Sequence, residues 1–455
     1  MASTMLQRTQ SGTETDSKKA TISVWVKLGG SHVGNFNAGI FGTHVSGNYG
    51  ADGNTQVGFY NGGLYAWFKD GGSTYYKQES TRRFRDHNAW YHLVYRYDMT
   101  ESTASNRIRV YVNGEEITSW SSTNNPSSTQ NIQMNNGGRI VRVGTYNFLN
   151  GTNNDFDGCM SHYYFCDGYS YAPTEFGETD STTGEWKIKT ETNVNHGTNG
   201  FLILKDGNTI TDQSTNSNDL SVGSGTLTKT EDNPSNVFCT MNPLNSVYIS
   251  FLQGNNTISG GNNGSDYSYI GSTLAANSGK FYWEVKAADL AEIDQVGVAL
   301  ASSSFSQIGL GGGLQNNFGG KSVQFSNGNK AGDSSQSAHM GGFSTDDILM
   351  VALDLDNNKI TFGRNGQWSN GSGGADQTYA NSTAAFTNLT AGEYYMPAHA
   401  MRGYGGNTGI SRYNFGNGYF ATTAVSSAGT NASGNGIFEY DVPTGFTALS
   451  TKGLN

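Results

Sequence analysis

The most suggestive arrangement of carboxylates in the sequence is Glu292-Ile293-Asp294, followed three residues later by Gly297. Retaining glycoside hydrolysis needs two carboxylates about 5 Å apart, one as nucleophile and one as acid/base. Enzymes of that kind carry the strand pattern Glu-x-Asp-x-x-Glu, and here its last position is glycine. A proton donor to the leaving group would be missing. We therefore expect a protein that is not an enzyme, with a polysaccharide depolymerase as the lesser alternative.

Aromatic side chains are the second group that could act on a ligand, because sugars are bound by aromatic faces and by Asn and Asp hydrogen bonds. Five of them fall within one stretch, and two more lie in or near loops of the second half: Tyr60, Tyr65, Trp67, Tyr75, Tyr76, Trp368 and Tyr404. Successive side chains of a strand point to opposite faces, so some of these must face a core. We expect glycan or partner contacts from this set, with core packing as the alternative for each member.

Short strands and tight turns must position these residues. The stretch 56–78 reads QVGFYNGG, LYAWFKDGG and STYYKQ, which predicts a three-stranded meander with Asn-Gly-Gly and Asp-Gly-Gly turns. The segments 89–116 and 346–368 share one order: an apolar strand ending in aspartate, a polar turn, a second strand and Asn-Gly. Ile348–Leu355 is apolar on both faces, which predicts a strand buried in a sandwich. No convincing amphipathic helix is found; the best short candidate is Glu284–Glu292, with a turn as the alternative.

Length and composition indicate a turn-rich β protein with more than one domain. The 455 residues are too many for one ordinary core. Glycine occurs 62 times, and charged residues make up only 14%, against roughly 25% in an average soluble protein. Many short strands with regularly spaced turns predict an all-β fold of β-sandwich or jelly-roll type.

The charge pattern argues against several classes of partner. The net charge is −10, and the only basic cluster is at 82–85, so we expect no nucleic-acid binding. No stretch approaches the ~20 apolar residues of a membrane span, and the first residues lack the apolar region of a secretory signal. The three cysteines (Cys159, Cys166 and Cys239) are odd in number and have no zinc-ligand spacing. We expect folding in a reducing cytosol without disulfides.

Residues 3–176 resemble the laminin G-like, concanavalin A-like jelly roll. The resemblance is carried by TISVWVKLG, AWYHLVYRYD, RIRVYVNGEEI, RIVRVGTYN and FDGCMSHYYFCDG. In that family these segments are core strands and their turns. Such domains often hold one Ca²⁺ at a rim, so the resemblance suggests Asp155 and Asp157 as Ca²⁺ ligands. The alternative is that these aspartates shape the turn before the strand at Cys159. We expect no other cofactor.

Residues 236–420 resemble a SPRY domain, a bent two-sheet β-sandwich. The residues that carry this are SGKFYWEVK, QVGVAL, DDILMVALDLDNNKITFGRNGQ, YYMPAHA and YNFGNGYF. SPRY domains bind partners through variable loops at one end of the sandwich, and loops on a rigid scaffold often carry function. The implied organisation is a jelly roll over 1–176, a partly packed connector over 177–235 and a SPRY-like sandwich with a C-terminal extension over 236–455.

Three connecting segments resemble structural proteins of tailed phages: FGETDSTTGEWKIK, NPSNVFCTMNPLN and VPTGFTALSTKGLN. The resemblance implies a virion protein that assembles in the host cytoplasm and is released by lysis. We expect a tail fibre or appendage that attaches to the host surface by binding glycan. The alternative is a capsid decoration or head-fibre protein. The expected partners are other virion proteins and copies of the same chain, in a trimer by our hypothesis, with no nucleic acid and no membrane insertion.

Overall fold

The computed structural model of the protein describes residues 4–32, 36–45, 54–69, 74–87, 89–145, 154–189, 192–205, 209–261, 266–333, 335–403 and 407–455. The described chain divides into two compact units. Unit 1 comprises 1–229 and 233–235, and unit 2 comprises 230–232 and 236–455. Both are built almost entirely from antiparallel strands, which confirms the all-β fold predicted from the sequence. Each unit is described by itself below.

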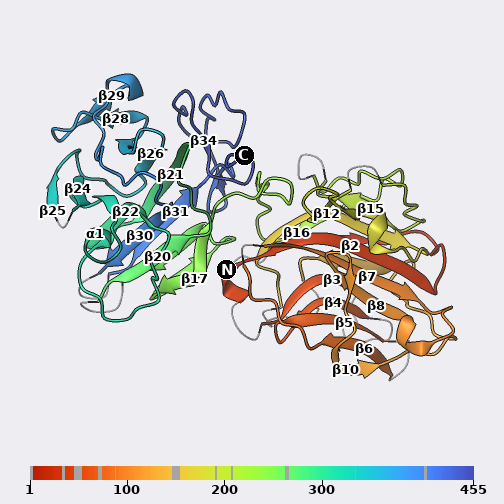
Figure 1. The fold of residues 1–455 in the computed structure, drawn as a ribbon. Helices are drawn as coiled ribbons and strands as arrows, with labels where there is room; N and C mark the ends of the chain where they lie inside the picture. Colours follow the sequence, from red (N-terminus) through yellow and green to blue (C-terminus); the bar gives the residue numbers. More distant parts are fainter. Residues whose placement is uncertain are drawn as a thin grey trace. The chain divides into compact units, whose positions relative to one another are not determined.

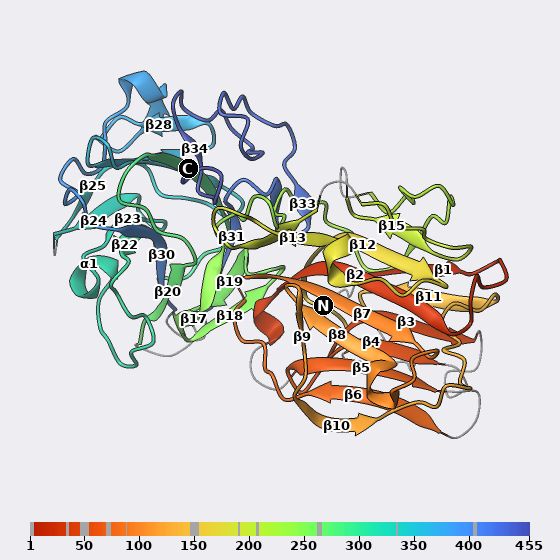
Figure 2. The same ribbon diagram turned by 45° about the vertical axis from the view of Figure 1, so that its right-hand side comes forward.

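Unit 1 is a sandwich of two sheets (Figures 1 and 2). The larger sheet contains, in order, β10 (Trp120–Asn124), β6 (Tyr75–Ser80), β5 (Gly63–Lys69), β4 (Thr55–Tyr60), β3 (Ala38–Val45), β11 (Arg139–Val143), β1 (Met5–Thr9) and β16 (Ser221–Ser224). The second contains β15 (Phe201–Ile203), β12 (Gly158–Asp167), β2 (Lys19–Leu28), β7 (Trp90–Asp98), β8 (Ile108–Val112) and β9 (Glu115–Glu116). Short 3₁₀ turns lie at Gly30–His32, Ala104–Asn106 and Pro173–Glu175.

The core of unit 1 lies between its two sheets. Alternate residues of β2 and β7, such as Ile22, Val24, Leu93 and Tyr95, face this core, as the period of two requires. Residues 177–229 take part in the same architecture: β15 pairs with β12, and β16 pairs with β1. The short hairpin of β13 (Gly177–Thr179) and β14 (Trp186–Ile188) also belongs to this unit.

Unit 2 is also built from two large sheets. One contains β17 (Met241–Val247), β20 (Ser268–Ser272), β30 (Tyr395–Arg402), β22 (Ile293–Leu300), β23 (Lys321–Gln324), β24 (Asn329–Gly332) and β25 (Ser335–Ala338). The other contains β18 (Ile249–Leu252), β19 (Thr257–Gly260), β31 (Gly409–Asn414), β21 (Lys280–Asp289), β26 (Ile348–Asp354), β27 (Lys359–Arg364), β28 (Gln367–Ser369) and β29 (Ala375–Gln377), with β34 (Thr447–Ala448) parallel to β21. Smaller elements are α1 (Leu314–Asn317), a 3₁₀ turn at Tyr379–Asn381, and the pair β32 (Tyr419–Phe420) and β33 (Thr423–Ala424).

The strand β26 is buried on both faces, as its sequence predicts. One face packs in the core between the two sheets with Leu349, Val351 and Leu353. The other face, with Met350 and Ala352, lies under a second apolar cluster that the C-terminal segment supplies: Phe438, Val442, Phe446 and Ala448. The C-terminal extension therefore completes the burial of this sheet.

The hairpin predicted twice is found twice, as β7–β8 and as β26–β27. Each first strand ends in an aspartate that organises the turn. Asp98 Oδ1 accepts a hydrogen bond from the Thr100 amide at 3.0 Å, and Asp354 Oδ1 accepts one from the Asn357 amide at 3.1 Å. The helix suggested for 284–292 is wrong: residues 284–289 continue β21, which pairs there with β26 and β31.

Candidate ligand-binding face of unit 1

The predicted meander is formed by β4, β5 and β6, which pair in sequence order. Figure 2 shows these strands side by side between β3 and β10. Along β5 the even positions Leu64, Ala66 and Phe68 point into the core, so the odd positions point outward. Tyr65 and Trp67 therefore stand on the outer face of the large sheet, where each is half-buried.

Four aromatic side chains form a row on this outer face, which we call the aromatic row: Tyr60, Tyr65, Trp67 and Tyr75. The ring centres of Tyr60 and Tyr65 are 5.4 Å apart, and those of Trp67 and Tyr75 are 6.1 Å apart. Tyr65 and Trp67 are two residues apart on one strand, so their Cα atoms are separated by about 6.6 Å. Tyr60 is 41% exposed and Tyr75 is 49% exposed. The row crosses β4, β5 and β6 obliquely and keeps its two ends in solvent.

Polar groups flank the aromatic row on the same face. Lys77 stands opposite Trp67, and Glu79 stands opposite Tyr65, on the neighbouring strand β6. Lys77 Nζ lies 2.9 Å from Glu79 Oε1 in an ion pair. On the other side, Tyr65 faces Gly58, which in turn pairs with Gly39 of β3. The positions next to Tyr65 on β4 and β3 are therefore both glycines without side chains. On β6, at the opposite side of Tyr65, the neighbouring groups are the charged side chains of Lys77 and Glu79.

Two predicted contact residues lie inside the protein. Tyr76 is 8% exposed and packs in the core of unit 1, with its ring centre 5.2 Å from that of Phe68. Trp368 is 4% exposed and packs in the second apolar cluster of unit 2, with its ring 5.0 Å from that of Tyr379. We therefore remove both from the candidate site, because neither ring offers a face to a ligand. The predicted Tyr404 lies outside the described residues.

The aspartates suggested for Ca²⁺ lie beside the end of the sandwich. Asp155 forms an isolated β-bridge with Thr145. The Asp157 amide donates to His32 Nε2 at 2.8 Å, and its carbonyl accepts from the Gly29 amide at 2.8 Å. Within the described ranges, no group of three or more His, Cys, Asp and Glu side chains is arranged to hold a metal ion. The contacts of both aspartates that the structure shows are therefore backbone contacts with distant segments of unit 1.

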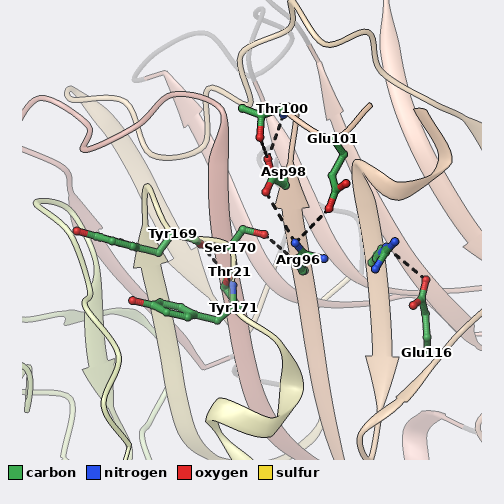
Figure 3. Close-up of polar contacts among 10 residues, drawn as sticks. Thr21, Arg96, Asp98, Thr100, Glu101, Glu116, Tyr169, Ser170 and Tyr171 are labelled. Atoms are coloured by element: carbon green, nitrogen blue, oxygen red, sulfur yellow. Dashed lines mark hydrogen bonds and ion pairs between the residues drawn. The ribbon is translucent and has the colours of Figure 1, made fainter. Parts of the chain in front are cut away.

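The outer face of the smaller sheet of unit 1 is occupied by the protein itself (Figure 3). Thr21 Oγ1 of β2 donates to the Tyr169 carbonyl at 2.9 Å and accepts from the Tyr171 amide at 2.8 Å. On the next strand, Arg96 Nε donates to Ser170 Oγ at 2.6 Å. These contacts fasten residues 169–171 onto the sheet. In unit 1, the outer face of the larger sheet therefore carries the aromatic row. The outer face of the smaller sheet is covered in part by residues 169–171.

The acidic pair Glu292 and Asp294 does not form a two-carboxylate site. Asp294 has no exposed surface and is hydrogen-bonded to His399 inside unit 2, whereas Glu292 is half exposed, 3.9 Å from Arg402. A Cβ at Gly297 would lie 2.1 Å from the Lys321 carbonyl oxygen. The close approach of β23 explains why residue 297 is glycine and excludes a glutamate there.

Lys77, Glu79 and Gly58 belong to the candidate site but were not predicted. The alternation of YYKQES places Tyr75, Lys77 and Glu79 on one face, so a strict period of two would have found the two charged residues. The same alternation separates Tyr75 from Tyr76. Gly58 has no such signal, because only the register between β4 and β5 brings it beside Tyr65.

Comparison with known proteins supports the first of the two sequence resemblances at the level of the fold. Residues 6–168 match the sequence model of the concanavalin A-like lectin/glucanases superfamily. Concanavalin A-like folds include enzymes and non-enzymes, and this fold fits a carbohydrate- or protein-binding role. A search of curated proteins found no match to the chain.

Solved structures similar to the chain include SPRY domains. The SPRY domain of human HERC1 is 16% identical, over 38% of this chain and 96% of that one, with a TM-score of 0.30. The TRIM65 PSpry domain is 14% identical, over 39% and 88%, with a TM-score of 0.28. Stonustoxin is 17% identical, over 39% of this chain and 27% of that one, with a TM-score of 0.27. The described residues contain no helix with the length and apolarity required to span a membrane.

Proposed function

We propose that the chain is a non-enzymatic glycan-binding protein whose ligand lies along the aromatic row of unit 1. The observation that carries this proposal is the row itself: four rings on one face of a rigid sheet, bordered by Lys77 and Glu79. An aromatic ring presents a large apolar face at low conformational cost, and the C–H face of a sugar ring can pack on it. The ion-paired Lys77 and Glu79 offer a donor and acceptors to sugar hydroxyl groups.

The shape of the row favours an extended glycan over a single terminal sugar. Successive ring contacts are spaced by roughly 5–7 Å along a nearly continuous line. An open row of this kind can contact several consecutive sugar units, each weakly. Several copies of the chain in one assembly would multiply such weak contacts into strong attachment.

We further propose that the protein belongs to the virion of a tailed phage, as a tail fibre or appendage protein that attaches to the host surface. The support is the resemblance of the three connecting segments to phage structural proteins. Other virion proteins and further copies of this chain, in a trimer, are the proposed partners. Assembly takes place in the host cytoplasm, and lysis releases the particles.

A non-enzymatic role is supported by the surroundings of Glu292 and Asp294. Asp294 is buried against His399, and the backbone of β23 leaves no room for a carboxylate at Gly297. The glycan therefore meets a binding face in this proposal and is not cleaved. Incubating the chain with a bound polysaccharide should leave the length distribution of that polysaccharide unchanged.

The glycan proposal is tested by applying the full chain to an array of bacterial surface polysaccharides. We expect binding to at least one extended glycan, and Trp67→Ala and Tyr75→Ala should each weaken it by about tenfold, as the loss of one buried aromatic contact implies. Tyr394→Ala is the matched control, because Tyr394 is an exposed tyrosine of unit 2. Equal binding by all three variants, or no binding by the wild-type chain, would contradict the proposal.

The virion proposal is tested separately by immunogold labelling of intact particles with antibody against this chain. Label at the tail is the expected result. Label spread over the head would replace the appendage with a capsid decoration protein. Particles without label, although their other surface proteins are accessible, would refute a virion location while leaving the glycan test unaffected.

A further inference from the structure

Unit 2 contains a polar pocket of about 270 Å³ at one end of its seven-stranded sheet, separate from the aromatic row. The hairpin β24–β25 forms one side, and residues 385–388 form the other. The lining residues are Lys330, Gly332, Asp333, Ser335, Ser337, Ala385, Phe386, Thr387 and Asn388. Pockets for drug-sized ligands span roughly 300–1,000 Å³, so this pocket suits a smaller molecule.

The pocket opens where the apolar core of unit 2 ends. Lys330 stands opposite the core residue Val323, and Lys321 stands opposite the core residue Val298, so both lysines lie on the inner face of the sheet. Their Nζ atoms lie 5.3 Å and 5.2 Å from the centre of the Phe386 ring. Two ammonium groups therefore occupy the sandwich interior at this edge, where the negative face of an aromatic ring partly compensates their charge.

The two lysines differ in the charge that they present to the pocket. Lys321 forms an ion pair with Asp333, whose second oxygen accepts from Asn388 Nδ2 at 3.0 Å. Lys330 Nζ donates to the neutral carbonyl of Ala385 at 2.8 Å, and it has no ion pair among the described residues. The pocket therefore retains one uncompensated positive charge. Burial, together with that charge, lowers the pKa of the neighbouring His339 to about 4.

The hydroxyl groups of the pocket set the width of the ligand. Ser337 stands directly opposite Lys330, and Ser335 stands opposite Gly332. The two serines are two residues apart on β25, so their Cα atoms are separated by about 6.6 Å. Gly332 lets the Phe386 ring pack closely against the hairpin, because a Cβ there would lie 2.5 Å from Phe386 Cε1. An isolated carboxylate or phosphate group is too small to reach Lys330 and both hydroxyl groups at once.

We propose that this pocket binds one carboxylate-bearing sugar unit. The carboxylate of the ligand pairs with Lys330 Nζ, and the ring hydroxyl groups bond to Ser335 and Ser337 on one side and to Thr387 and Asn388 on the other. Ser335 Oγ donates to the Gly332 carbonyl at 3.1 Å, which leaves its lone pairs to accept from a sugar hydroxyl. The requirement for both an anionic group and a hydroxylated ring follows from the charge and the width of the pocket.

Saturation-transfer NMR on the full chain tests this proposal with four probes: glucuronate, its neutral methyl ester, glucose and acetate. Glucuronate is expected to bind. The ester and glucose are expected to bind at least about tenfold more weakly, the effect of losing one hydrogen bond to a charged group, and acetate is expected to bind more weakly because it lacks the ring hydroxyl groups. Lys330→Met should weaken glucuronate binding by a similar factor while keeping the aliphatic stem of the side chain.

Two further variants make the test specific. Lys286→Met is the matched control, because Lys286 is a lysine of the same unit that pairs with Asp346 at 3.1 Å, outside the pocket. Ser337→Leu lies on an exposed edge strand and fills the pocket beside Lys330 while keeping its ammonium group, so it replaces Lys330→Met if that variant does not fold. Trp67→Ala should leave the effect of Lys330→Met on glucuronate binding unchanged, which separates this site from the glycan-binding face of unit 1.

The proposal would be overturned by any of four results. Equal affinity for glucuronate and its ester would remove the role of charge. Equal affinity for acetate would show an adventitious anion only. Unchanged binding by both Lys330→Met and Ser337→Leu would place the ligand elsewhere. Failure of glucuronate to bind at all would refute recognition of an acidic sugar.

Discussion

At the scale of single residues, Glu284 is the most constrained carboxylate of unit 2. It is fully buried on β21 and accepts four hydrogen bonds: from Tyr282 Oη at 2.9 Å, Asn414 Nδ2 at 3.2 Å, the Glu439 amide at 2.9 Å and the Tyr440 amide at 2.8 Å. The last two donors belong to the segment that covers the outer face of the sheet. Glu284 therefore binds the C-terminal segment through its backbone.

Glu284 should make the stability of unit 2 depend on pH. Burial raises the pKa of Glu284 to about 7, above the 4.5 of an exposed glutamate. Between pH 4.5 and pH 7, the carboxyl group of Glu284 is protonated in the folded state but ionised in the unfolded state. The stability that this proton contributes is therefore fully present below pH 4.5 and is lost as the pH rises through 7. The difference between pH 5 and pH 8 amounts to ~2–3 kcal/mol.

Replacing Glu284 by glutamine removes the titrating group and should remove that part of the pH dependence. We expect the change in the free energy of unfolding between pH 5 and pH 8 to differ by ~2–3 kcal/mol between Glu284→Gln and the wild-type chain. Urea unfolding followed by tryptophan fluorescence measures it. Glu292→Gln is the control, because Glu292 is half exposed. The same pH dependence in Glu284→Gln and wild type would show that Glu284 does not titrate as inferred.

At the scale of elements, the segment 169–171 is held on the small sheet of unit 1 by Arg96 and by the hydroxyl group of Thr21. Thr21 Oγ1 satisfies both a carbonyl and an amide of that segment (Figure 3). We expect Thr21→Val to lower the free energy of unfolding of unit 1 by about 1–3 kcal/mol, because two partly buried backbone groups lose their partner. Urea unfolding of the two chains provides the comparison.

A matched control for this variant is available in the other sheet. Thr43 of β3 is fully buried, and its hydroxyl group has no hydrogen-bond partner among the described residues. Thr43→Val should therefore be neutral or slightly stabilising, since it removes an unsatisfied polar atom. An equal loss of stability in both variants would assign the effect to side-chain packing and not to the anchored segment.

The strands of the meander and of both hairpins could be predicted from period-two alternation and Asn-Gly turns, because these signals are local. The inner face of a strand is harder to predict, since it depends on the partner sheet. Tyr75 and Tyr76 are adjacent in an aromatic stretch, and only the packing of Tyr76 against Phe68 decides which of them meets solvent. Trp368 follows a tight turn and resembles a loop residue, yet residues 438–448 bury it from about 70 positions away.

At the scale of the whole molecule, the segment 177–229 shows how weak sequence patterns can complete a strong architecture. Its composition is rich in Thr, Asn, Gly and Asp, and its apolar island GFLIL supplies β15. Phe201, Ile203, Leu204 and Leu220 enter the main core of unit 1. The sequence revealed the island but not its partner, because the pairing with β12 is set by contacts far apart in the chain.

This architecture predicts that a fragment of residues 1–229 is more stable than a fragment of residues 1–176. The shorter fragment loses β15 and β16 and leaves β12 and β1 as open edges, with Tyr163 and Phe165 exposed where Phe201 packs against them. We expect it to melt at a lower temperature and to bind a hydrophobic dye. Identical melting curves for the two fragments would show that residues 177–229 are not part of the folding unit.

The pairing of the two ends of unit 2 has a consequence for synthesis on the ribosome. Phe238 forms a β-bridge with Ser450, and the Cys239 amide donates to the Leu449 carbonyl at 2.9 Å. Residues near 238 leave the exit tunnel some 200 codons before their partners are translated. The nascent sandwich must wait with Met350 and Trp368 uncovered, within reach of chaperones. A stop codon that removes residues 441–455 would therefore yield a product that is prone to aggregation and to proteolysis.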